Sequence, residues 1–433
     1  MSKVSKDELN ERLQYSLDLK VEWAVQKILE YYLHYKGQVY LTFSGGKDSQ
    51  VVLEIVNRMF EGKYNHYFKE IPYEYGLTAK NCLKYGKIPS TFADTGLEKP
   101  EVRKHALSFE GVTRLVPDRK FKDVVVEEGV ALGSKRHARS IREINFDHTP
   151  RNLTTRTFTL TGVMPSGKKT QAKIPKRYYH LIDKEKVRQI IIDNKNSDKC
   201  NPAIDTLDPE DFGKAPTFKI SDKCCKYFKK DPFHKYEKET KRKPITGTMA
   251  VESNQRRFAY LKSGCNTFDG SGNSMSRPLS IWTPKDVWEF HDREGIRFAE
   301  CYYDHDTEYR GEAVKVEGSD REGCMFCLFG VEQEEDRKNQ GKLQYNRFEK
   351  LAITHPRQHQ FLIKNLGFDE VLDSIGVSHT PDYTAANIKT IVTSEDSIPL
   401  MDSTLQAVAD AINNNEGTVE EFVDSLIKTK TKG

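Results

Sequence analysis

One loop of the sequence combines the residue types that bind phosphate, and it reads Ser44-Gly45-Gly46-Lys47-Asp48-Ser49. Its two glycines let the backbone turn sharply and expose N–H groups to an anion. The two serine hydroxyls can donate hydrogen bonds, and Lys47 supplies a positive charge. Asp48 would repel a phosphate unless a Mg²⁺ ion lies between them. An acid within such a loop therefore predicts a metal-bridged pyrophosphate leaving group.

The residues on either side of this loop support the same prediction. An apolar run at Val39–Phe43 is typical of a short buried strand, and Gln50–Phe60 has helical spacing. Strand, glycine loop and helix follow in the order that a phosphate site needs, because the helix N-terminus adds its dipole to the attraction. The loop lacks the spacer and the Gly-Lys-Ser/Thr ending of a Walker motif, which excludes a motor ATPase or a GTPase of that type.

The cysteines form a second group with chemical potential. Cys324 and Cys327 have the two-residue spacer that lets both sulfurs face one metal, and Cys224-Cys225 lies about a hundred residues upstream. Four thiolates hold zinc or an iron–sulfur cluster. Adjacent cysteines reach one site only in a tight helical turn, so Cys265 competes with Cys225 for the fourth position. Inert thiols are the remaining interpretation of this set.

The elements that must position these residues alternate between strands and helices. Strands are expected at 39–43, 88–93, 113–116 and 244–247, and helices at 6–32, 50–60, 99–109 and 122–129. The pattern predicts an α/β fold with a doubly wound, mostly parallel sheet. Ligands of such sheets bind beyond the carboxyl ends of the strands, where both the Ser44 loop and Asp94 are expected.

The rest of the chain is expected to surround this catalytic domain. We predict an N-terminal helix over 1–36, a catalytic domain over 37–330, and a helical module over 331–433. Within the catalytic domain, 145–222 is expected to be an insertion and 223–330 the cluster and substrate region. More locally, we expect a hairpin over 157–174, helices over 184–194 and from Pro284, and a loop over 263–276. Capping patterns are predicted at Ser5 with Glu8 and at Thr418 with Glu421.

Composition excludes several classes of protein. The 433 residues are 37% hydrophobic and 30% charged, which fits a soluble globular chain rather than a disordered one. No stretch approaches the roughly 18 apolar residues of a membrane helix. The N-terminus lacks the apolar core of a signal peptide, so a cytoplasmic location is expected. The net charge is +4, and the basic run Lys226–Lys243 is either a solvated face or a nucleic-acid contact.

At the Ser44 loop the chain resembles the PP-loop ATP pyrophosphatase superfamily, whose signature is Ser-Gly-Gly-x-Asp-Ser. Three further blocks are similar to the phosphoadenylylsulfate (PAPS) reductase branch of that superfamily. They are Phe92–Glu101 with Asp94-Thr95-Gly96, Ile245-Thr246-Gly247 with Glu252-Ser253 and Arg256, and Pro278–Trp288. The resemblance covers roughly Val39 to Gly330. It implies an adenine nucleotide alpha hydrolase-like fold in which ATP and Mg²⁺ serve to adenylate a substrate oxygen.

The resemblance also implies roles for particular residues. Lys47, Asp48 and Asp94 would be catalytic, with Asp94 as a second Mg²⁺ or ribose contact. The nucleotide would be bound by the loop Ser44 to Ser49, by Asp94, Thr95 and Gly96, and by Arg256 or its neighbour Arg257 pairing with phosphate. The two cysteine pairs resemble the ligands of the [4Fe-4S] cluster in the adenylylsulfate reductases, which makes Cys224, Cys225, Cys324 and Cys327 its expected ligands.

Two departures separate this chain from those reductases. No cysteine follows Cys327, where they carry a nucleophilic thiol, and the phosphate loop is intact where theirs is degraded. An intact loop with a cluster matches the DndC-like DNA phosphorothioation ATPases and the cluster-dependent tRNA thiolation enzymes, and the block from Lys223 to Gly330 looks closer to the first. We therefore expect sulfur transfer onto DNA or tRNA, with a cysteine desulfurase or sulfur carrier and proteins of the same operon as partners.

Three alternatives remain open at this point. The first alternative is a PAPS or adenylylsulfate reductase that resolves its intermediate without the usual thiol. The second is a protein that binds ATP and a cluster for regulation, without turnover. A sulfate adenylyltransferase subunit is the third alternative, although such subunits need no cluster cysteines.

Overall fold

A computed structural model describes residues 4–70, 82–146, 150–170, 173–268, 274–309 and 312–381. The chain forms two compact units. Unit 1 contains residues 1–120, 225–303 and 319–324, and unit 2 contains 121–224, 304–318 and 325–433. Within the described ranges, no helix has the length and apolar character that crossing a membrane requires.

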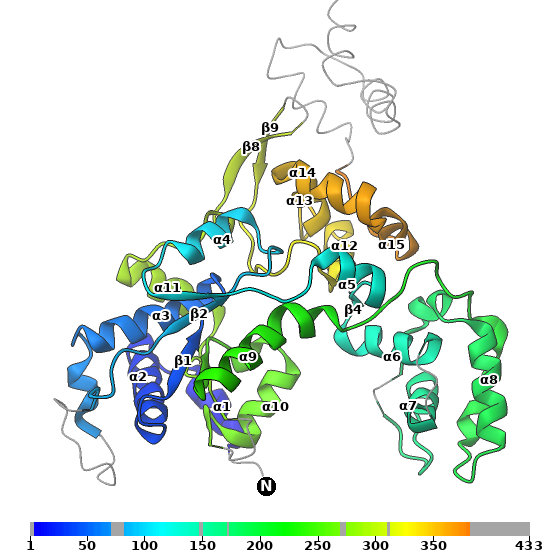
Figure 1. The fold of residues 1–433 in the computed structure, drawn as a ribbon, viewed down its shortest axis with the longest axis horizontal. Coiled ribbons are helices and arrows are strands. Elements are labelled where there is room, and N and C mark those ends of the chain that lie inside the picture. The colour runs from blue at the N-terminus through cyan, green and yellow to red at the C-terminus, as the bar shows by residue number, and fades with distance from the viewer. Residues whose placement is uncertain are drawn as a thin grey trace, which may run out of the picture. The chain divides into compact units, whose positions relative to one another are not determined.

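Unit 1 is built on a six-stranded sheet with the strand order β3-β2-β1-β5-β7-β6. Figure 1 labels the neighbouring strands β1 and β2 of this sheet. The strands are β1 Val39–Thr42, β2 Ser90–Ala93, β3 Val112–Leu115, β5 Lys243–Thr246, β6 Asn266–Thr267 and β7 Met275–Ser276. All neighbours are parallel except β6, which runs antiparallel to β7. The predicted α/β class with a mostly parallel sheet is therefore confirmed, and the expected loop over 263–276 contains the short strands β6 and β7.

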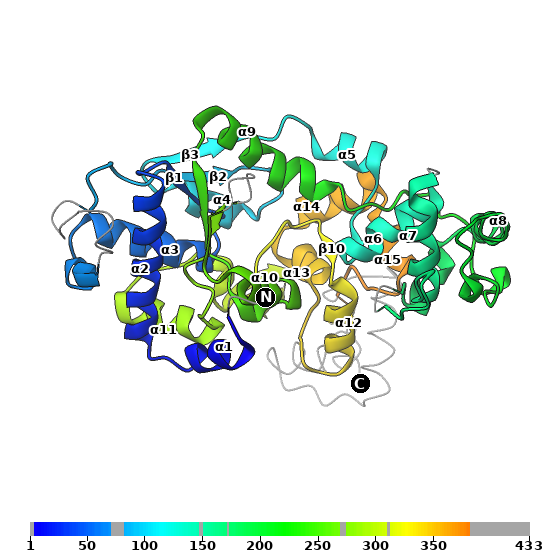
Figure 2. The same cartoon turned by 90° about the horizontal axis from the view of Figure 1, so that it is seen from below.

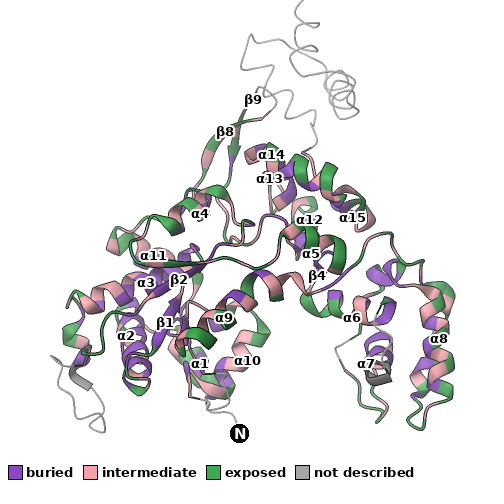
Figure 3. Cartoon of the chain, viewed as in Figure 1, coloured by how far each residue is buried: buried purple, intermediate pink, exposed green. Residues whose placement is uncertain are grey.

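Helices cover both faces of β1, as alternation of its side chains requires. Val39, Leu41 and Phe43 join one buried core with α2 (Leu17–His34) and α3 (Lys47–Phe60). Tyr40 points the other way, packs on Phe233 and Tyr236, and donates a 2.8 Å hydrogen bond to Glu237 of α9 (Asp231–Thr240). Figure 2 shows α9 beside β3, and Figure 3 shows the buried residues of β1 and α2 in purple.

The N-terminal segment is two helices rather than the predicted one. α1 (Lys6–Leu13) begins with the expected capping box of Ser5 and Glu8, and α2 follows after a break. Ser16 caps α2 by accepting a hydrogen bond from the N–H of Leu19. The buried Lys20 ammonium donates to the carbonyl oxygen of Leu13 at 2.8 Å and to Asp286 at 2.7 Å. These bonds satisfy polar groups that a break in a helix would otherwise leave without partners.

The remaining helices of unit 1 are α4 Pro100–Leu107, α10 Asn254–Ser263 and α11 Pro284–Glu294, with 3₁₀ turns at Asn65–Glu70, Ala250–Glu252 and Glu300–Tyr302. Of these helices, α4 and α11 lie where the sequence predicts helices, whereas α10 was not predicted. α11 starts at the predicted proline, because Thr283 caps it and Pro284 occupies its first turn. A π-helical segment, η6 (Lys226–Lys230), leads directly into α9.

Unit 2 is mainly helical. Its helices are α5 Phe121–Glu128, α6 Lys135–Asn145, α7 Pro150–Thr161, α8 Lys184–Lys195, α12 Val331–Asn339, α13 Arg347–Thr354, α14 Pro356–Gln360 and α15 Phe368–Ser374. Shorter helical turns lie at Lys176–Leu181, Pro202–Ile204, Pro209–Asp211 and Phe361–Asn365. Two small ladders complete it, β4 Leu132–Gly133 with β10 Leu328–Phe329 and β8 His305–Tyr309 with β9 Glu312–Val316.

The boundaries of the compact units differ from those of the predicted domains. The segment expected as an insertion and the expected C-terminal module belong to one unit. Strand β10 pairs with β4, and the Tyr178 hydroxyl donates a 2.6 Å hydrogen bond to Glu332, so residues far apart in sequence share one core. Local sequence patterns predict the helices and strands of each segment, but they do not show which distant segments pack together.

The predicted hairpin over 157–174 is wrong in its first half. Residues 157–161 are the last part of α7, where the Thr161 hydroxyl donates to the carbonyl oxygen of Thr157 at 2.9 Å. Alternating threonines mimic a strand, but they fit a helix when the hydroxyl bonds back to the preceding turn. Only a single antiparallel bridge, Val163 with Lys169, surrounds the predicted turn in the described part of this region. The capping pattern at Thr418 lies outside the described residues.

Candidate active site

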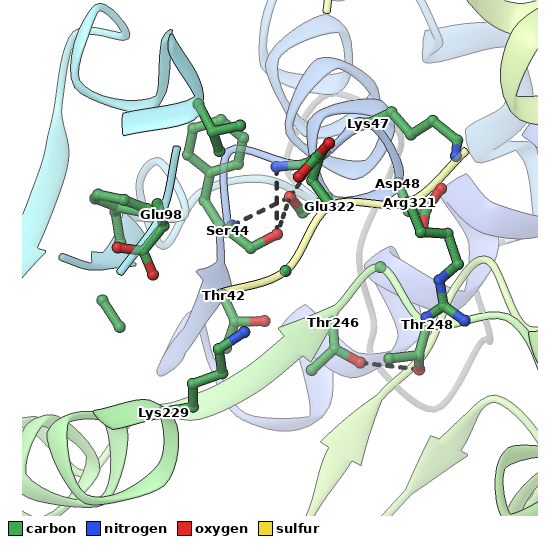
Figure 4. Close-up of a pocket in the computed structure, with 18 of the residues that line it drawn as sticks. Thr42, Ser44, Lys47, Asp48, Glu98, Lys229, Thr246, Thr248, Arg321 and Glu322 are labelled. Carbon is green, nitrogen blue, oxygen red and sulfur yellow. Dashed lines mark hydrogen bonds between the residues drawn. The ribbon is translucent and has the colours of Figure 1, made fainter. Parts of the chain in front are cut away.

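A cavity of about 390 Å³ lies in unit 1, beyond the carboxyl ends of β1, β2 and β5 (Figure 4). This is where an open parallel sheet binds its ligands, and the volume lies in the usual range for small-molecule pockets. Residues of the predicted site that line it are Ser44, Gly46, Lys47, Asp48, Ser49, Thr95 and Arg256. Residues that line it without having been predicted for the site include Thr42, Glu98, Lys229, Thr248, Tyr302, Arg321 and Glu322.

Hydrogen bonds between Ser44 and Ser49 join the two ends of the phosphate loop. The N–H of Ser44 donates to the hydroxyl oxygen of Ser49 at 3.1 Å, and the two hydroxyl oxygens lie 3.0 Å apart. Ser49 also donates to the carbonyl oxygen of Gly46 at 2.8 Å. Gly45 has a φ of +73°, and a Cβ there would lie 3.0 Å from atoms of Val102. The loop conformation therefore requires glycine at this position.

The loop places the N-terminus of α3 at the cavity. The N-cap residue of α3 is Gly46, which provides no side chain to accept hydrogen bonds from the first turn. The first N–H groups of a helix have no partner within the helix, and they carry the positive end of its dipole. Because Lys47, Asp48 and Ser49 form this first turn and line the cavity, an anion bound there would meet these donors.

Asp48 has the properties of a cation ligand. Its Oδ1 atom is buried and has no hydrogen-bond partner among the described residues. Burial raises the pKa of the Asp48 carboxyl group, although the charges of Lys47, Arg321 and Arg256 act to lower it. A buried carboxylate oxygen without a partner is costly unless a cation binds it. The residues present therefore fit a Mg²⁺ ion held between Asp48 and a phosphate.

Lys47 is fixed against the wall of the cavity. Its side chain is buried, and the ammonium group donates to the carbonyl oxygen of Asp320 and lies 5.4 Å from the centre of the Tyr302 ring. Burial lowers the pKa of Lys47. Loss of water makes this ammonium a stronger electrostatic partner for a phosphate than an exposed lysine would be.

Asp94 is not among the described residues that line the cavity. Its side chain is buried, and its two oxygens accept hydrogen bonds of 2.8 Å each from Arg103 and a further bond from Arg114. Both oxygens are thus engaged by arginines that support the end of β2, and a contact of Asp94 with the nucleotide stays a prediction from the sequence. Its neighbour Thr95 lines the cavity, whereas Gly96 does not.

Arg256 lines the cavity as predicted, and it shares a buried carboxylate with a second arginine. Glu252 forms ion pairs with Arg256 and with Arg321, the latter at 2.7 Å, and it also accepts a 2.8 Å hydrogen bond from the N–H of Met249. Arg257, the alternative in the sequence, is not among the described lining residues. Sequence reasoning missed Arg321, although it stands three residues before the motif cysteine Cys324.

A third cation approaches from the opposite wall. Lys229 lies in the π-helical segment η6 and lines the cavity, and Figure 4 shows it reaching toward Thr42, away from Lys47 and Arg321. π-Helical turns occur frequently at functional sites because they shift one side chain out of the regular helical register. The basic run Lys226–Lys243 was the only signal in the sequence that pointed to Lys229.

The predicted cluster ligands are half-buried and in no disulfide. Cys224 and Cys225 lie in one helical turn, the local geometry that two adjacent ligands would need, and Cys324 and Cys327 flank a turn. Cys225 and Cys324 belong to unit 1, while Cys224 and Cys327 belong to unit 2. No group of three or more His, Cys, Asp or Glu side chains within the described ranges is arranged to hold a metal. The cluster therefore stays a prediction from the sequence.

The rival ligand Cys265 lies in the core of unit 1. It is 4% exposed, and its sulfur accepts a 3.2 Å hydrogen bond from the indole N–H of Trp23. Burial raises the pKa of its thiol. A protonated, core-packed thiol is a poor metal ligand, so this environment favours the tandem pair over Cys265.

Comparisons with known proteins give little beyond this geometry. No family model matches the chain, and no curated protein matches it. Among solved structures, the chain is similar to the PAPS reductase from Candida auris in its phosphate complex, with 12% sequence identity. The similarity covers 69% of this chain and 91% of that chain, with a TM-score of 0.27.

Proposed function

We propose that this chain binds Mg²⁺-ATP in the cavity of unit 1 and cleaves it between the α and β phosphates. One observation carries the proposal. The N-terminus of α3, which has no side-chain cap, borders the cavity, and so does Asp48, whose buried Oδ1 atom has no hydrogen-bond partner among the described residues. The first favours bound phosphate and the second favours a bound cation, and Mg²⁺-ATP supplies both.

The residues of the loop would hold the pyrophosphate part of the nucleotide. Backbone N–H groups of the first turn of α3 and the Lys47 ammonium would donate to phosphate oxygens, while Asp48 would bind the cation. Mg²⁺ would supply the positive charge that neutralises the leaving pyrophosphate. Negative charge develops on the leaving group as the α–β bond breaks, and cations already fixed beside it stabilise that charge without reorganising.

The products of this reaction would be pyrophosphate and an adenylated substrate. A substrate oxygen attacks the α-phosphorus, the bond to the β-phosphate breaks, and the oxygen becomes part of the AMP ester. A sulfur nucleophile at the oxidation level of sulfide then displaces AMP, which leaves with the original oxygen. The net change is replacement of oxygen by sulfur. A persulfide donor would also need a thiol to reduce it.

We further propose a nucleic acid, DNA or tRNA, as the acceptor. Lys229 of the cavity wall and Lys226 belong to the same segment η6, and Arg119 and Lys226 lie 4.6 Å and 4.9 Å from the centre of the Tyr227 ring. Clustered cations with an aromatic ring are typical of surfaces that bind a phosphate backbone and a base. The four cysteines would serve the sulfur step as ligands of a [4Fe-4S] cluster, and a desulfurase or sulfur carrier would supply sulfur.

Pyrophosphate release tests the first part of this proposal. Anaerobically purified protein is incubated with Mg²⁺-ATP and, in separate arms, no acceptor, DNA or tRNA. With labelled sulfide added to every arm as the sulfur nucleophile, AMP and pyrophosphate are expected in equal amounts, more with the true acceptor, and Asp48→Asn should abolish both. Asp292→Asn, which changes a carboxyl group with 77% of its side chain exposed, is the matched control.

Other products would contradict the proposal in distinguishable ways. ADP and inorganic phosphate would show cleavage at the wrong bond. Tight binding of ATP without products in any arm would favour a regulatory protein. Sulfite released from labelled PAPS or adenylylsulfate without ATP consumption would favour a reductase. Incorporation of labelled sulfur into DNA or tRNA would identify the acceptor.

A further inference from the structure

The short segment Ser319–Gly323 is attached to three different parts of unit 1. The carbonyl oxygen of Asp320 accepts a hydrogen bond from Lys47 of the phosphate loop. Arg321 pairs with Glu252 of the 3₁₀ turn that precedes α10. Glu322 accepts a 2.8 Å hydrogen bond from Lys99, just before α4. These attachments hold Arg321 and Glu322 in the cavity wall rather than in free solvent.

The bond between Arg321 and Glu252 is one that a ligand can replace at low cost. The Arg321 side chain is 61% exposed, whereas that of Glu252 is 6% exposed. Glu252 would keep two partners without Arg321, because its other oxygen is bonded by Arg256 and by the N–H of Met249. Half-exposed ion pairs contribute little to stability, so Arg321 can move from this carboxylate to a phosphate without leaving a buried charge unpaired.

Arg256 and Arg321 pair with the same carboxylate, so their positive charges lie close together and favour a bound anion. Burial lowers the pKa of Arg256, and the neighbouring positive charge of Arg321 lowers it further. Both guanidinium groups stay protonated, so their mutual repulsion persists. Glu252 offsets one of the two charges, and the charge of Asp48, which also acts on Arg256, would be neutralised by the cation that Asp48 is expected to bind. A di-anionic group between them would relieve the repulsion and accept paired hydrogen bonds from each fork.

The position of Arg321 indicates which part of the nucleotide it would meet. Figure 4 shows it beside Asp48 and Thr248, on the opposite side of the cavity from Lys229 and Glu98. The charges of Arg321 and Arg256 both act on the Asp48 carboxylate. Since Asp48 is the expected cation ligand, this side of the cavity is the side of the metal-bridged phosphates.

We propose that Arg321 binds the β and γ phosphates of ATP together with Arg256, and that it moves from Glu252 to the phosphates when the nucleotide binds. This inference rests on the proposed function, since it assigns a further residue to the same site. It makes Ser319–Gly323 part of the nucleotide site, although the segment lies more than two hundred residues beyond the phosphate loop.

Calorimetric titration of Arg321→Ala and Arg321→Lys tests the inference, with Mg²⁺-ATP, Mg²⁺-pyrophosphate and AMP as separate ligands. Loss of a charged hydrogen-bond donor should weaken binding of ATP and of pyrophosphate by about 10- to 100-fold. AMP binding should be unchanged, and the lysine variant should recover part of the loss. An equal loss for AMP, or no loss for pyrophosphate, would overturn the inference.

The control is Arg297→Ala, because the Arg297 side chain is 72% exposed and its ion-pair partner is Glu300. It should bind all three ligands as the wild type does. If the wild type binds no ATP, the proposed function itself fails. If the wild type binds ATP and Arg321→Ala binds it equally well, only the role of Arg321 fails.

Discussion

The backbone of Gly247 lies directly against that of Asp48. A Cβ atom on Gly247 would lie 2.7 Å from the carbonyl oxygen of Asp48, closer than such atoms approach in proteins. β5 pairs with β1 with Thr246 opposite Thr42, so the chain that leaves β5 must pass over the first turn of α3. Contact between two backbones, rather than a left-handed conformation, therefore requires glycine here.

Gly247→Ala is expected to displace the first turn of α3 and to abolish release of pyrophosphate. The clash involves backbone on both sides, so no flexible side chain can absorb it, and the free energy of unfolding should fall by about 1–3 kcal/mol. Thermal unfolding and the pyrophosphate assay measure the two effects. Asp292→Asn is again the control, since 77% of the Asp292 side chain is exposed. Full activity in Gly247→Ala would contradict the role of this contact.

Asp48→Asn is expected to stabilise the nucleotide-free protein while it abolishes activity. Burial raises the pKa of Asp48 above its ordinary value of 3.8. A carboxyl group that binds its proton more tightly when folded lowers the free energy of unfolding as the pH rises from 3.8 through the raised pKa. Asparagine removes this loss, and the thermal midpoint should rise by roughly 2–4 °C for each kcal/mol recovered.

Ionisation of the Asp48 carboxyl group should also control the binding of the cation. In the wild type, affinity for Mg²⁺-ATP should rise with pH over that window, because the cation needs the ionised carboxylate. Calorimetric titration at several pH values measures this dependence, and Asp48→Asn should remove it. A variant less stable than the wild type at neutral pH would show that Asp48 has a partner that offsets its burial.

The sheet and the loop were predictable because local signals determine them. Val39–Phe43, the glycine pair and Pro284 carry short-range information on strand, turn and helix start, and the structure has the corresponding elements at those places. The break after Leu13 was not predicted, because the apolar periodicity continues across it. Ser16 and Lys20 supply the capping and the buried charge that separate α1 from α2.

The composition of the cavity wall was only partly predictable. Lys229 reaches the cavity from the π-helical segment η6 and Arg321 from the irregular segment Ser319–Gly323, and no sequence motif indicated either position. Asp94 was expected in the site because it follows a strand, but a residue at a strand end can face either side of the loop. Arg103 and Arg114 bind both of its oxygens, an arrangement that favours a structural role and that the sequence did not indicate.

Asp94→Asn is therefore expected to reduce stability more than nucleotide affinity. Burial alone would raise the pKa of Asp94, but the hydrogen bonds and charges of Arg103 and Arg114 outweigh it and lower that pKa below 3.8. The stabilisation is thus present above pH 3.8 and is lost as the pH falls through the lowered pKa. At neutral pH the variant should lose about 1–3 kcal/mol, measured by urea unfolding. A large loss of ATP affinity with normal stability would restore Asp94 to the nucleotide site.

Single serine substitutions should separate cluster ligands from core thiols. Anaerobically purified wild type is expected to contain roughly four iron and four sulfide per chain. Cys224→Ser, Cys225→Ser, Cys324→Ser and Cys327→Ser should each lower the iron content strongly, because each removes one thiolate. Cys265→Ser should keep the iron yet unfold more easily, since it places a hydroxyl group in a core where the sulfur accepts a bond from Trp23. If Cys265→Ser loses its iron and Cys225→Ser keeps it, Cys265 is the fourth ligand and Cys225 is not. If the protein contains zinc in place of iron, the iron–sulfur cluster is excluded.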